Sequence, residues 1–146
     1  MADAAALARA CADAMWADDR ASAALGIEIT DVAPGRAVAS MTVRADMVNG
    51  HGMAHGGYVF TLADTAFAFA CNTHGQRTVA AGAEIAFLAP APEGARLRAE
   101  AVERYREGRS GICDVTVRAQ DGTVVAEFRG RSRTIAGRLV PEGQGA

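Results

Sequence analysis

The chain has 146 residues, half of them apolar, and a formal net charge of −2. This is the usual length of a single domain, and this share of apolar residues allows a sizeable interior without metals or disulfides. Because the charge balance is slightly acidic and no block of basic residues occurs, the composition gives no reason to expect a nucleic-acid partner.

The first half of the chain is predicted to form one helix, a hairpin and a loop. Residues 3–19 favour a helix, because Ala is frequent and apolar residues recur every four positions. Alternating polar and apolar residues then predict strands over 27–30 and 37–44, joined by a turn at Pro34-Gly35. Residues 45–55 show no periodicity and are expected to form a loop.

A long apolar helix is predicted over residues 56–73, ending near Gly75. Four strands and a loose tail follow it, over 79–88, 95–104, 111–118, 123–134 and 136–146. This order of helices and strands predicts an α+β fold, in which an antiparallel sheet with one solvent-exposed face wraps around helix 56–73. One domain spanning 1–146 accounts for the whole chain.

The three cysteines, Cys11, Cys71 and Cys113, stand far apart without a CxxC pair, which is typical of reduced thiols in a cytoplasmic protein. The N-terminal segment lacks a basic leader followed by a long apolar run, so no secretory signal is expected. The most apolar segment, 58–71, is shorter than the roughly 20 residues that span a bilayer. We therefore expect a soluble cytoplasmic domain without a membrane segment.

Asp64 lies in the middle of the apolar helix, and residues 58–63 and 65–71 carry no other charge. It is either a structural acid that is hydrogen-bonded or points outward, or a functional acid. A buried carboxylate without a partner is costly, and desolvation favours its protonated form. Because no polar face is available to receive the acid, Asp64 is a functional candidate.

The same helix begins with Gly56-Gly57. Glycines at this position allow a ligand to approach the backbone, and the first turn presents unpaired N–H groups at the positive end of the helix dipole. Such a terminus binds anions or the oxyanion that develops when a carbonyl is attacked. The alternative is a plain glycine bend.

Spacing constrains how Gly56 and Asp64 can cooperate. Eight residues separate them, so on one helix they lie about 12 Å apart. A carbonyl polarised by the Gly56 N–H therefore cannot also touch Asp64 of the same chain. If both act on one substrate, two antiparallel helices must meet around a twofold axis, which predicts an obligate dimer with two shared sites.

The segment HGGYVFTLADTAFAFACN, at 55–72, resembles the signature of hotdog-fold acyl-CoA thioesterases of the phenylacetate-degradation (PaaI) type. The resemblance extends over nearly the whole chain, through LGIEI (25–29), MTV (41–43), NGHG (49–52), FLAP (87–90) and FRGRSRTI (128–135). It implies a hotdog fold, dimers that usually pair into tetramers, and a site between subunits. It also implies hydrolysis of acyl-CoA thioesters, often aryl-acetyl ones, without a metal or an organic cofactor.

The resemblance assigns roles to four residues. Asp64 is expected to act as general base on water or as nucleophile on the thioester carbonyl. The N–H of Gly56 is expected to polarise that carbonyl, and the amide of Asn49 to position water or thioester. His55 orients the loop or contacts the thioester.

Three features leave alternatives open. Relatives commonly carry a hydroxyl residue, an acid or amide, and Arg-Pro where AGAEIAFLAP has Glu84, Ala86 and Ala89, so the acyl group stays undetermined. His51 and His55 precede the helix without a third ligand, which argues against a metal site. Outward arginines at 129, 131 and 133 and segment 106–110 are unranked candidates for a CoA phosphate contact.

Two rival functions are a non-catalytic acyl-CoA sensor and an enoyl-thioester hydratase. A sensor does not need an acid in the helix and often carries a DNA-binding extension, for which residues 1–25 are too short. A hydratase needs a separate His-plus-acid motif that the sequence does not show. We therefore predict a thioesterase acting on phenylacetyl-CoA or a hydroxylated relative.

Overall fold

The computed structural model describes residues 3–142. Its helices and strands, in chain order, are α1 (Ala4–Asp18), α2 (Arg20–Ala24), β1 (Glu28–Ala33), β2 (Arg36–Thr42), the 3-10 helix η1 (Ala45–Met47), α3 (Gly56–Cys71), β3 (Gln76–Phe87), β4 (Arg96–Glu107), β5 (Ser110–Ala119) and β6 (Val124–Arg138). The order of elements agrees with the prediction, apart from the short helices α2 and η1.

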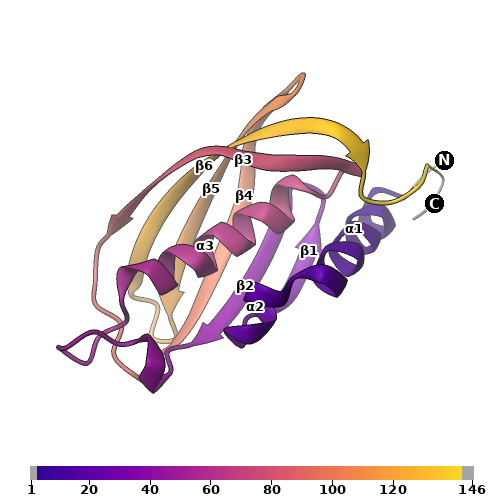
Figure 1. Ribbon diagram of the computed structural model, residues 1–146. Coiled ribbons are helices and arrows are strands. Elements are labelled where there is room, and N and C mark those ends of the chain that lie inside the picture. The colour runs from indigo at the N-terminus through magenta and orange to yellow at the C-terminus, as the bar shows by residue number, and fades with distance from the viewer. Residues whose placement is uncertain (1–2, 143–146) are drawn as a thin grey trace.

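All six strands form one antiparallel sheet in the order β1-β2-β4-β5-β6-β3. The sheet curls around α3, which lies along its concave face, while α1 lies beside β1 at one end (Figure 1). This confirms the predicted α+β hotdog arrangement. Because β3 follows α3 directly and pairs with the last strand, it becomes an edge of the sheet.

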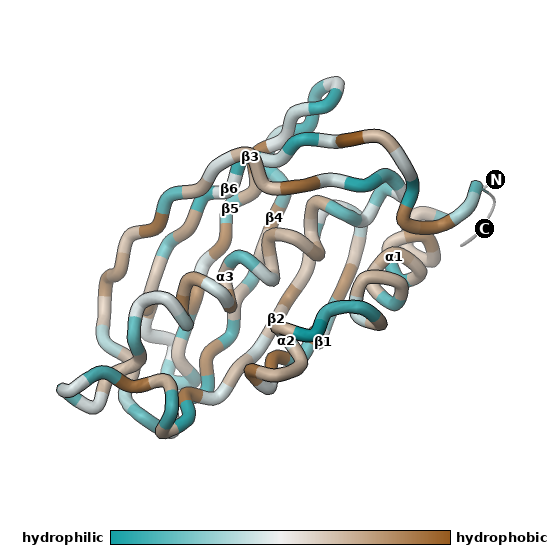
Figure 2. Tube along the Cα trace, viewed as in Figure 1, coloured by the Kyte–Doolittle hydropathy of each residue, from teal (hydrophilic) through white to brown (hydrophobic). Residues whose placement is uncertain are grey.

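The core lies between α3 and the concave face of the sheet. Teal and brown alternate along the strands in Figure 2, as expected for a sheet with one wet and one buried face. Phe67 and Phe69 on α3 are only 1% and 2% exposed, so both pack in the core. A Cβ on Gly130 of β6 would lie 2.7 Å from the ring of Phe67, so glycine is required there for the helix to approach the sheet.

The N-terminal helix is interrupted where the sequence predicted one helix to residue 19. Asp19 caps a second short helix, α2, by accepting hydrogen bonds from the backbone N–H and the hydroxyl of Ser22, at 3.0 and 2.7 Å. The hydroxyl of Ser22 also lies 3.3 Å from that of Thr65 on α3. A capping side chain and one tertiary contact therefore decide where α1 ends.

The prediction of a loose tail from residue 136 is wrong for its first residues. Strand β6 continues to Arg138, because β3 begins at Gln76 and the two residues pair. The N–H of Leu139 then donates to the carbonyl of Gly75 at 2.9 Å, and Val140 is buried. The rest of the predicted tail, from residue 143 on, lies outside the described residues.

Side chains at the C-terminal end of α3 fasten it to the sheet. The buried amide of Asn72 donates to the carbonyls of Ala68 and Thr78, at 2.8 and 2.9 Å, and accepts from the Thr78 N–H at 2.9 Å. The hydroxyl of Thr73 accepts from the N–H of Gly35 at 2.8 Å. These bonds fix the axial position of α3 against β3 and the β1–β2 turn.

Candidate active site

The loop before α3 is organised around Asn49. Its side-chain oxygen accepts hydrogen bonds from the N–H groups of His51 and Met53, at 2.9 and 3.3 Å. The backbone of Asn49 also pairs with Met53 through an N–H···O bond of 2.8 Å. Because the oxygen is used within the loop, the exposed amide is oriented so that its NH₂ group is left to act as a donor.

His55 caps α3 at its N-terminus. Its Nδ1 accepts from the N–H of Gly57 at 3.3 Å, and its own N–H donates to the carbonyl of Met47 at 2.8 Å. The histidine therefore joins the loop to the helix, and both of its predicted roles stay predictions. The N–H of Gly56, the first helical residue, has no partner within the helix and none elsewhere in residues 3–142.

Gly56 and Asn49 face the same cleft, which has a volume of about 670 Å³. The rest of its lining is mostly apolar and comes from the loop, α3, the end of β3 and β6, including Met53, Val59, Phe87, Leu88, Pro90 and Val125. A Cβ on Gly56 would lie 2.9 Å from the ring of Phe87. A side chain at this position would therefore displace the half-exposed ring of Phe87.

Phe87 and Leu88 line this cleft, although the sequence reasoning assigned no role to either. They are 54% and 60% exposed, high values for large apolar side chains. The available signal was their place at the end of an apolar strand, directly before Ala89-Pro90.

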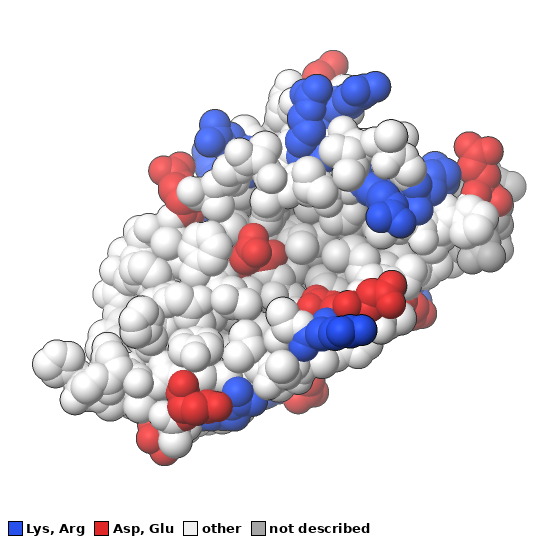
Figure 3. Space-filling model, in the orientation of Figure 1, with Lys and Arg blue, Asp and Glu red and all other residues white. Residues whose placement is uncertain are grey.

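Asp64 lies two turns further along α3 and outside this cleft. Its side chain is half-buried and has no hydrogen-bond or ion-pair partner in residues 3–142. Burial among apolar neighbours raises the pKa of the carboxyl above its usual value. The face carrying α3 is largely uncharged, with charges gathered at its margins (Figure 3). The structure thus brings Asn49, His55 and Gly56 together and leaves the acid apart from them.

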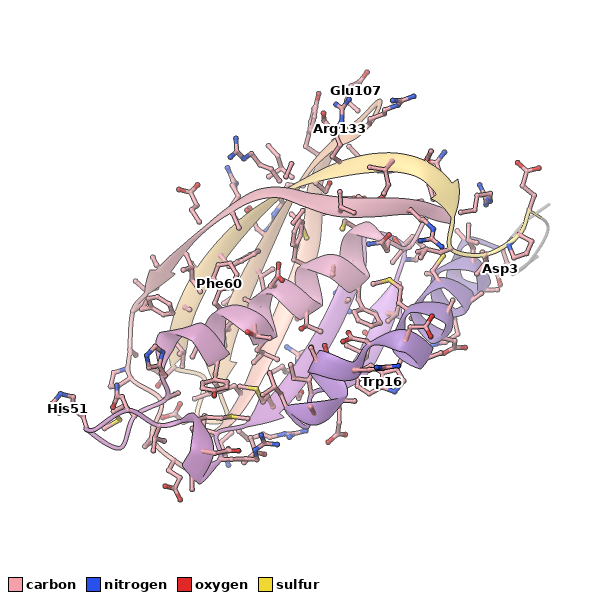
Figure 4. All side chains as sticks on the ribbon, viewed as in Figure 1. Asp3, Trp16, His51, Phe60, Glu107 and Arg133 are labelled. Atoms are coloured by element: carbon pink, nitrogen blue, oxygen red, sulfur yellow. The ribbon has the colours of Figure 1, made fainter. Side chains whose placement is uncertain are left out.

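Other candidates for chemistry are weak. Within residues 3–142, no three His, Cys, Asp or Glu side chains are grouped to hold a metal ion; His51 points outward at the tip of its loop (Figure 4). Burial raises the pKa of Cys71 to about 12 and also raises that of Cys113, so neither thiol forms a ready nucleophile at neutral pH. No helix in the described part of the chain has both the length and the apolarity to cross a membrane.

Comparison with known proteins decides the family. The model of the thioesterase superfamily matches residues 51–126, which include the end of the loop before α3, the whole of α3, strands β3 to β5 and the first residues of β6. The chain belongs to the thioesterase superfamily. Among curated superfamily relatives, it is 44% identical over 131 residues to the acyl-coenzyme A thioesterase PaaI of Escherichia coli, covering 90% of this chain and 94% of that protein. It is also 37% identical over 91 residues to a putative esterase of Archaeoglobus fulgidus, covering 62% and 59%.

Solved structures of superfamily members agree. The structure of E. coli PaaI, from the phenylacetic acid degradation operon, superposes with a TM-score of 0.92 at 43% identity, covering 93% of this chain and 99% of that one. A variant of PaaI from Thermus thermophilus gives 0.77 at 40% identity, covering 80% and 100%. The predictions of a hotdog fold and of a thioesterase are therefore confirmed.

Proposed function

We propose that the chain hydrolyses aryl-acetyl-CoA thioesters, phenylacetyl-CoA or a hydroxylated relative, to the free acid and CoA. The E. coli relative is an acyl-coenzyme A thioesterase from a phenylacetic acid degradation operon, which supports the substrate class. The observation that carries the proposal is Asp64, a half-buried acid on an apolar helix without any partner in its own chain. The cytoplasmic location stays a prediction from the sequence.

The site requires two copies of the chain, because Asp64 and Gly56 lie about 12 Å apart on one helix. Strand β3 is a 12-residue sheet edge whose concave-face residues, including Ala80, Ala83 and Phe87, are exposed. A long, exposed, apolar edge of this kind is a template for pairing with another chain. Antiparallel pairing of two β3 strands extends the sheet and brings each Gly56 toward the partner's Asp64. Further pairing into a tetramer stays a prediction.

In this arrangement the catalytic groups have separate tasks. The unpaired N–H of Gly56 holds the carbonyl oxygen and the oxyanion that follows attack. The NH₂ of Asn49 orients water or the thioester. In one route the partner's Asp64 takes a proton from the attacking water, and CoA leaves as the thiol or thiolate. In the other, Asp64 attacks the carbonyl itself, CoA leaves, and water hydrolyses the resulting anhydride to the free acid and the carboxylate. Both routes need the ionised carboxylate, and partial desolvation makes that carboxylate more basic.

The cleft beside Gly56 suits an uncharged aryl or alkyl acyl group. Phe87, Leu88, Val59 and Pro90 supply apolar contact surface, and the described lining contains no Asp, Glu or Arg side chain. An acyl group whose carbonyl oxygen reaches Gly56 therefore enters an environment that disfavours a second carboxylate. This supports phenylacetyl over dicarboxylic acyl groups.

The test is hydrolysis of phenylacetyl-CoA by Asp64→Ala and Asp64→Asn. We expect kcat to fall by about a hundredfold to ten-thousandfold, the usual contribution of a positioned acid or base. In the unchanged chain, kcat/KM falls as the pH drops through the pKa of Asp64. Retained turnover in the Asp64 variants contradicts the proposal. So does an unchanged chain that binds acyl-CoA without hydrolysing it, as a sensor would.

Asp64→Asn also supplies the folding control. Since burial raises the pKa of Asp64, the native state disfavours its charged form, and this costs stability above that pKa. The variant should therefore unfold at a higher temperature than the unchanged chain at pH 7. The difference should disappear at a pH below the carboxyl's unfolded-state pKa, where both states are neutral.

A further inference from the structure

Arginines gather at one corner of the molecule, where β3 begins, β6 ends and β4 turns into β5. These arginines, which we call the arginine corner, are Arg77, Arg106, Arg109, Arg131, Arg133 and Arg138. Strand pairing brings them together, since Arg133 lies opposite Val79 and Ser110, and Arg131 opposite Gly82 and Ile112. Figure 3 shows the basic surface around the β4–β5 hairpin and the end of β6, and Figure 4 places Arg133 near Glu107 of the hairpin.

The arginine corner lacks compensating charge. None of its six arginines lies within ion-pair distance of a carboxylate in residues 3–142, whereas Arg104 and Arg129 both pair with Asp114. The corner's own carboxylates are Glu107 and Glu142. A cationic corner on a chain with a net charge of −2 indicates that an anion binds there.

Three of these arginines are held in place by glycines. The guanidinium of Arg131 lies directly over Gly82, where a Cβ would collide with it. The side chain of Arg77 packs against Gly137, with its Nε 3.3 Å from where a Cβ on that glycine would lie. Arg138 packs against Gly75 in the same way. Arginines packed against backbone lose less side-chain conformational entropy on binding than free surface side chains do. This favours hydrogen bonding of their planar guanidinium groups to phosphate.

A cleft of about 500 Å³ opens within the corner. Its lining includes the side chains of Arg109, Arg138 and Gln76, the carboxylate of Glu142, and Ile135, which is 44% exposed. Phosphate-binding cations beside an exposed apolar side chain are the chemistry that a nucleotide needs for its phosphates and its base.

We propose that the arginine corner binds the phosphates of the CoA nucleotide, and that it belongs to the same chain as the acid. This rests on the proposed function and adds to it. Asn72, at the end of α3 beside the corner, is eight residues from Asp64, or about 12 Å along the helix. The pantetheine arm is about as long as four extended residues, roughly 14 Å. Gly56 of the same chain, 16 residues from Asn72, is about 24 Å away and too distant.

The division between subunits follows from these lengths. One protomer supplies Asp64 and the arginine corner, and its partner supplies Gly56, Asn49 and the acyl cleft. A CoA thioester bound this way spans the interface, with its sulfur near the acid and its phosphates at the corner. Of the candidates the sequence left unranked, Arg131, Arg133, Arg106 and Arg109 therefore bind phosphate, and Arg129, paired with Asp114 at 2.6 Å, does not.

The test compares two substrates that share one reacting thioester, phenylacetyl-CoA and phenylacetyl-N-acetylcysteamine, which lacks the nucleotide. The variant is Arg109→Ala/Arg133→Ala, because both side chains are exposed and neither is in an ion pair within the described residues. Its KM for phenylacetyl-CoA should rise about tenfold or more, since charge-assisted hydrogen bonds are lost, while kcat changes by less than about twofold. Its kinetics with the truncated substrate should not change.

Arg118→Ala is the matched control, an exposed arginine at the opposite end of β5, and should leave both substrates unaffected. An unchanged KM for phenylacetyl-CoA in the double variant, or an equal rise for both substrates, overturns the proposal. An arginine-dependent preference for an acyl carrier protein over acyl-CoA also overturns it, in favour of an acidic protein partner.

Calorimetric binding of free CoA separates this proposal from the proposed function. Measured in the Asp64→Asn background, CoA affinity should fall about tenfold on adding Arg109→Ala/Arg133→Ala and should weaken with added salt. If the unchanged chain hydrolyses no thioester, the proposed function fails while this measurement still decides the role of the corner. Equal CoA affinity with and without the two arginines overturns the proposed role of the arginine corner in phosphate binding.

Discussion

The two ends of helix α3 differ in how many of their polar groups find hydrogen-bond partners in their own chain. At the C-terminal end, Asn72 and Thr73 are buried and bonded to backbone groups of neighbouring strands. His74 beyond them contacts the nearly buried Glu103, with 2.8 Å between Nε2 and Oε1. At the N-terminal end, the N–H of Gly56 has no acceptor in residues 3–142, and the ring of Phe87 beside it is half exposed.

The difference separates a structural end from a reactive one. Polar groups that are buried and fully bonded fix the position of the helix and have no donor left for a ligand. An unpaired N–H at a helix start, beside an apolar cleft, is a site ready for a carbonyl oxygen. Asp64 lies between the two ends and has no hydrogen-bond or ion-pair partner in residues 3–142, which is the observation behind the proposal that a second chain completes the site.

The largest effect should come from disrupting the sheet edge that we propose pairs with a second chain. Ala83→Glu places a carboxylate on the exposed concave face of β3, where it would oppose burial of this edge against a partner. We expect a folded monomer with kcat/KM lowered about a hundredfold or more, because each site loses its acid. Sedimentation velocity and phenylacetyl-CoA hydrolysis measure the two effects.

Ala17→Glu, the same change at an exposed position of α1, is the control and should keep both assembly and activity. A monomeric Ala83→Glu chain with full activity would show that one chain suffices.

The next largest effect should come from the helix start. Gly56→Ala brings its new methyl group to 2.9 Å from Phe87 and should move the N–H that we propose holds the carbonyl oxygen. We expect kcat/KM to fall about tenfold to a hundredfold, with partial recovery in Gly56→Ala/Phe87→Leu. In Gly57→Ala the nearest atom, His55 Nδ1, is 3.7 Å away, so activity should stay close to normal. Equal losses in both single variants would point to backbone flexibility.

The smallest effect on catalysis should come from the satisfied end of α3. Asn72→Ala removes the side-chain partner of the N–H and carbonyl of Thr78 and one donor to the carbonyl of Ala68, and should cost about 2–3 kcal/mol in unfolding free energy. Urea unfolding at fixed protein concentration measures this loss, and the activity of the folded fraction should be unchanged. Asn49→Ala, at an exposed amide, should show the reverse pattern: reduced activity with little loss of stability.

Periodicity and turn residues were sufficient to predict most of the fold. Alternation and turn residues together predicted the six strands, and the uncharged run around Asp64 predicted the helix that the sheet covers. The boundaries that differed depended on single contacts: the cap of Ser22 by Asp19 starts α2, and the pairing of Gln76 with Arg138 lengthens β6. Such contacts join residues whose proximity local sequence patterns do not reveal.

The sequence by itself determined which groups are available for chemistry: one acid in an apolar helix, a Gly-Gly helix start, and a spacing of about 12 Å that prevents the two from meeting in one chain. Only the tertiary structure decided how these groups are surrounded, because surroundings depend on distant strands. It placed the ring of Phe87 over Gly56, paired Arg129 with Asp114, and gathered the remaining arginines of β6 with those of the β4–β5 hairpin.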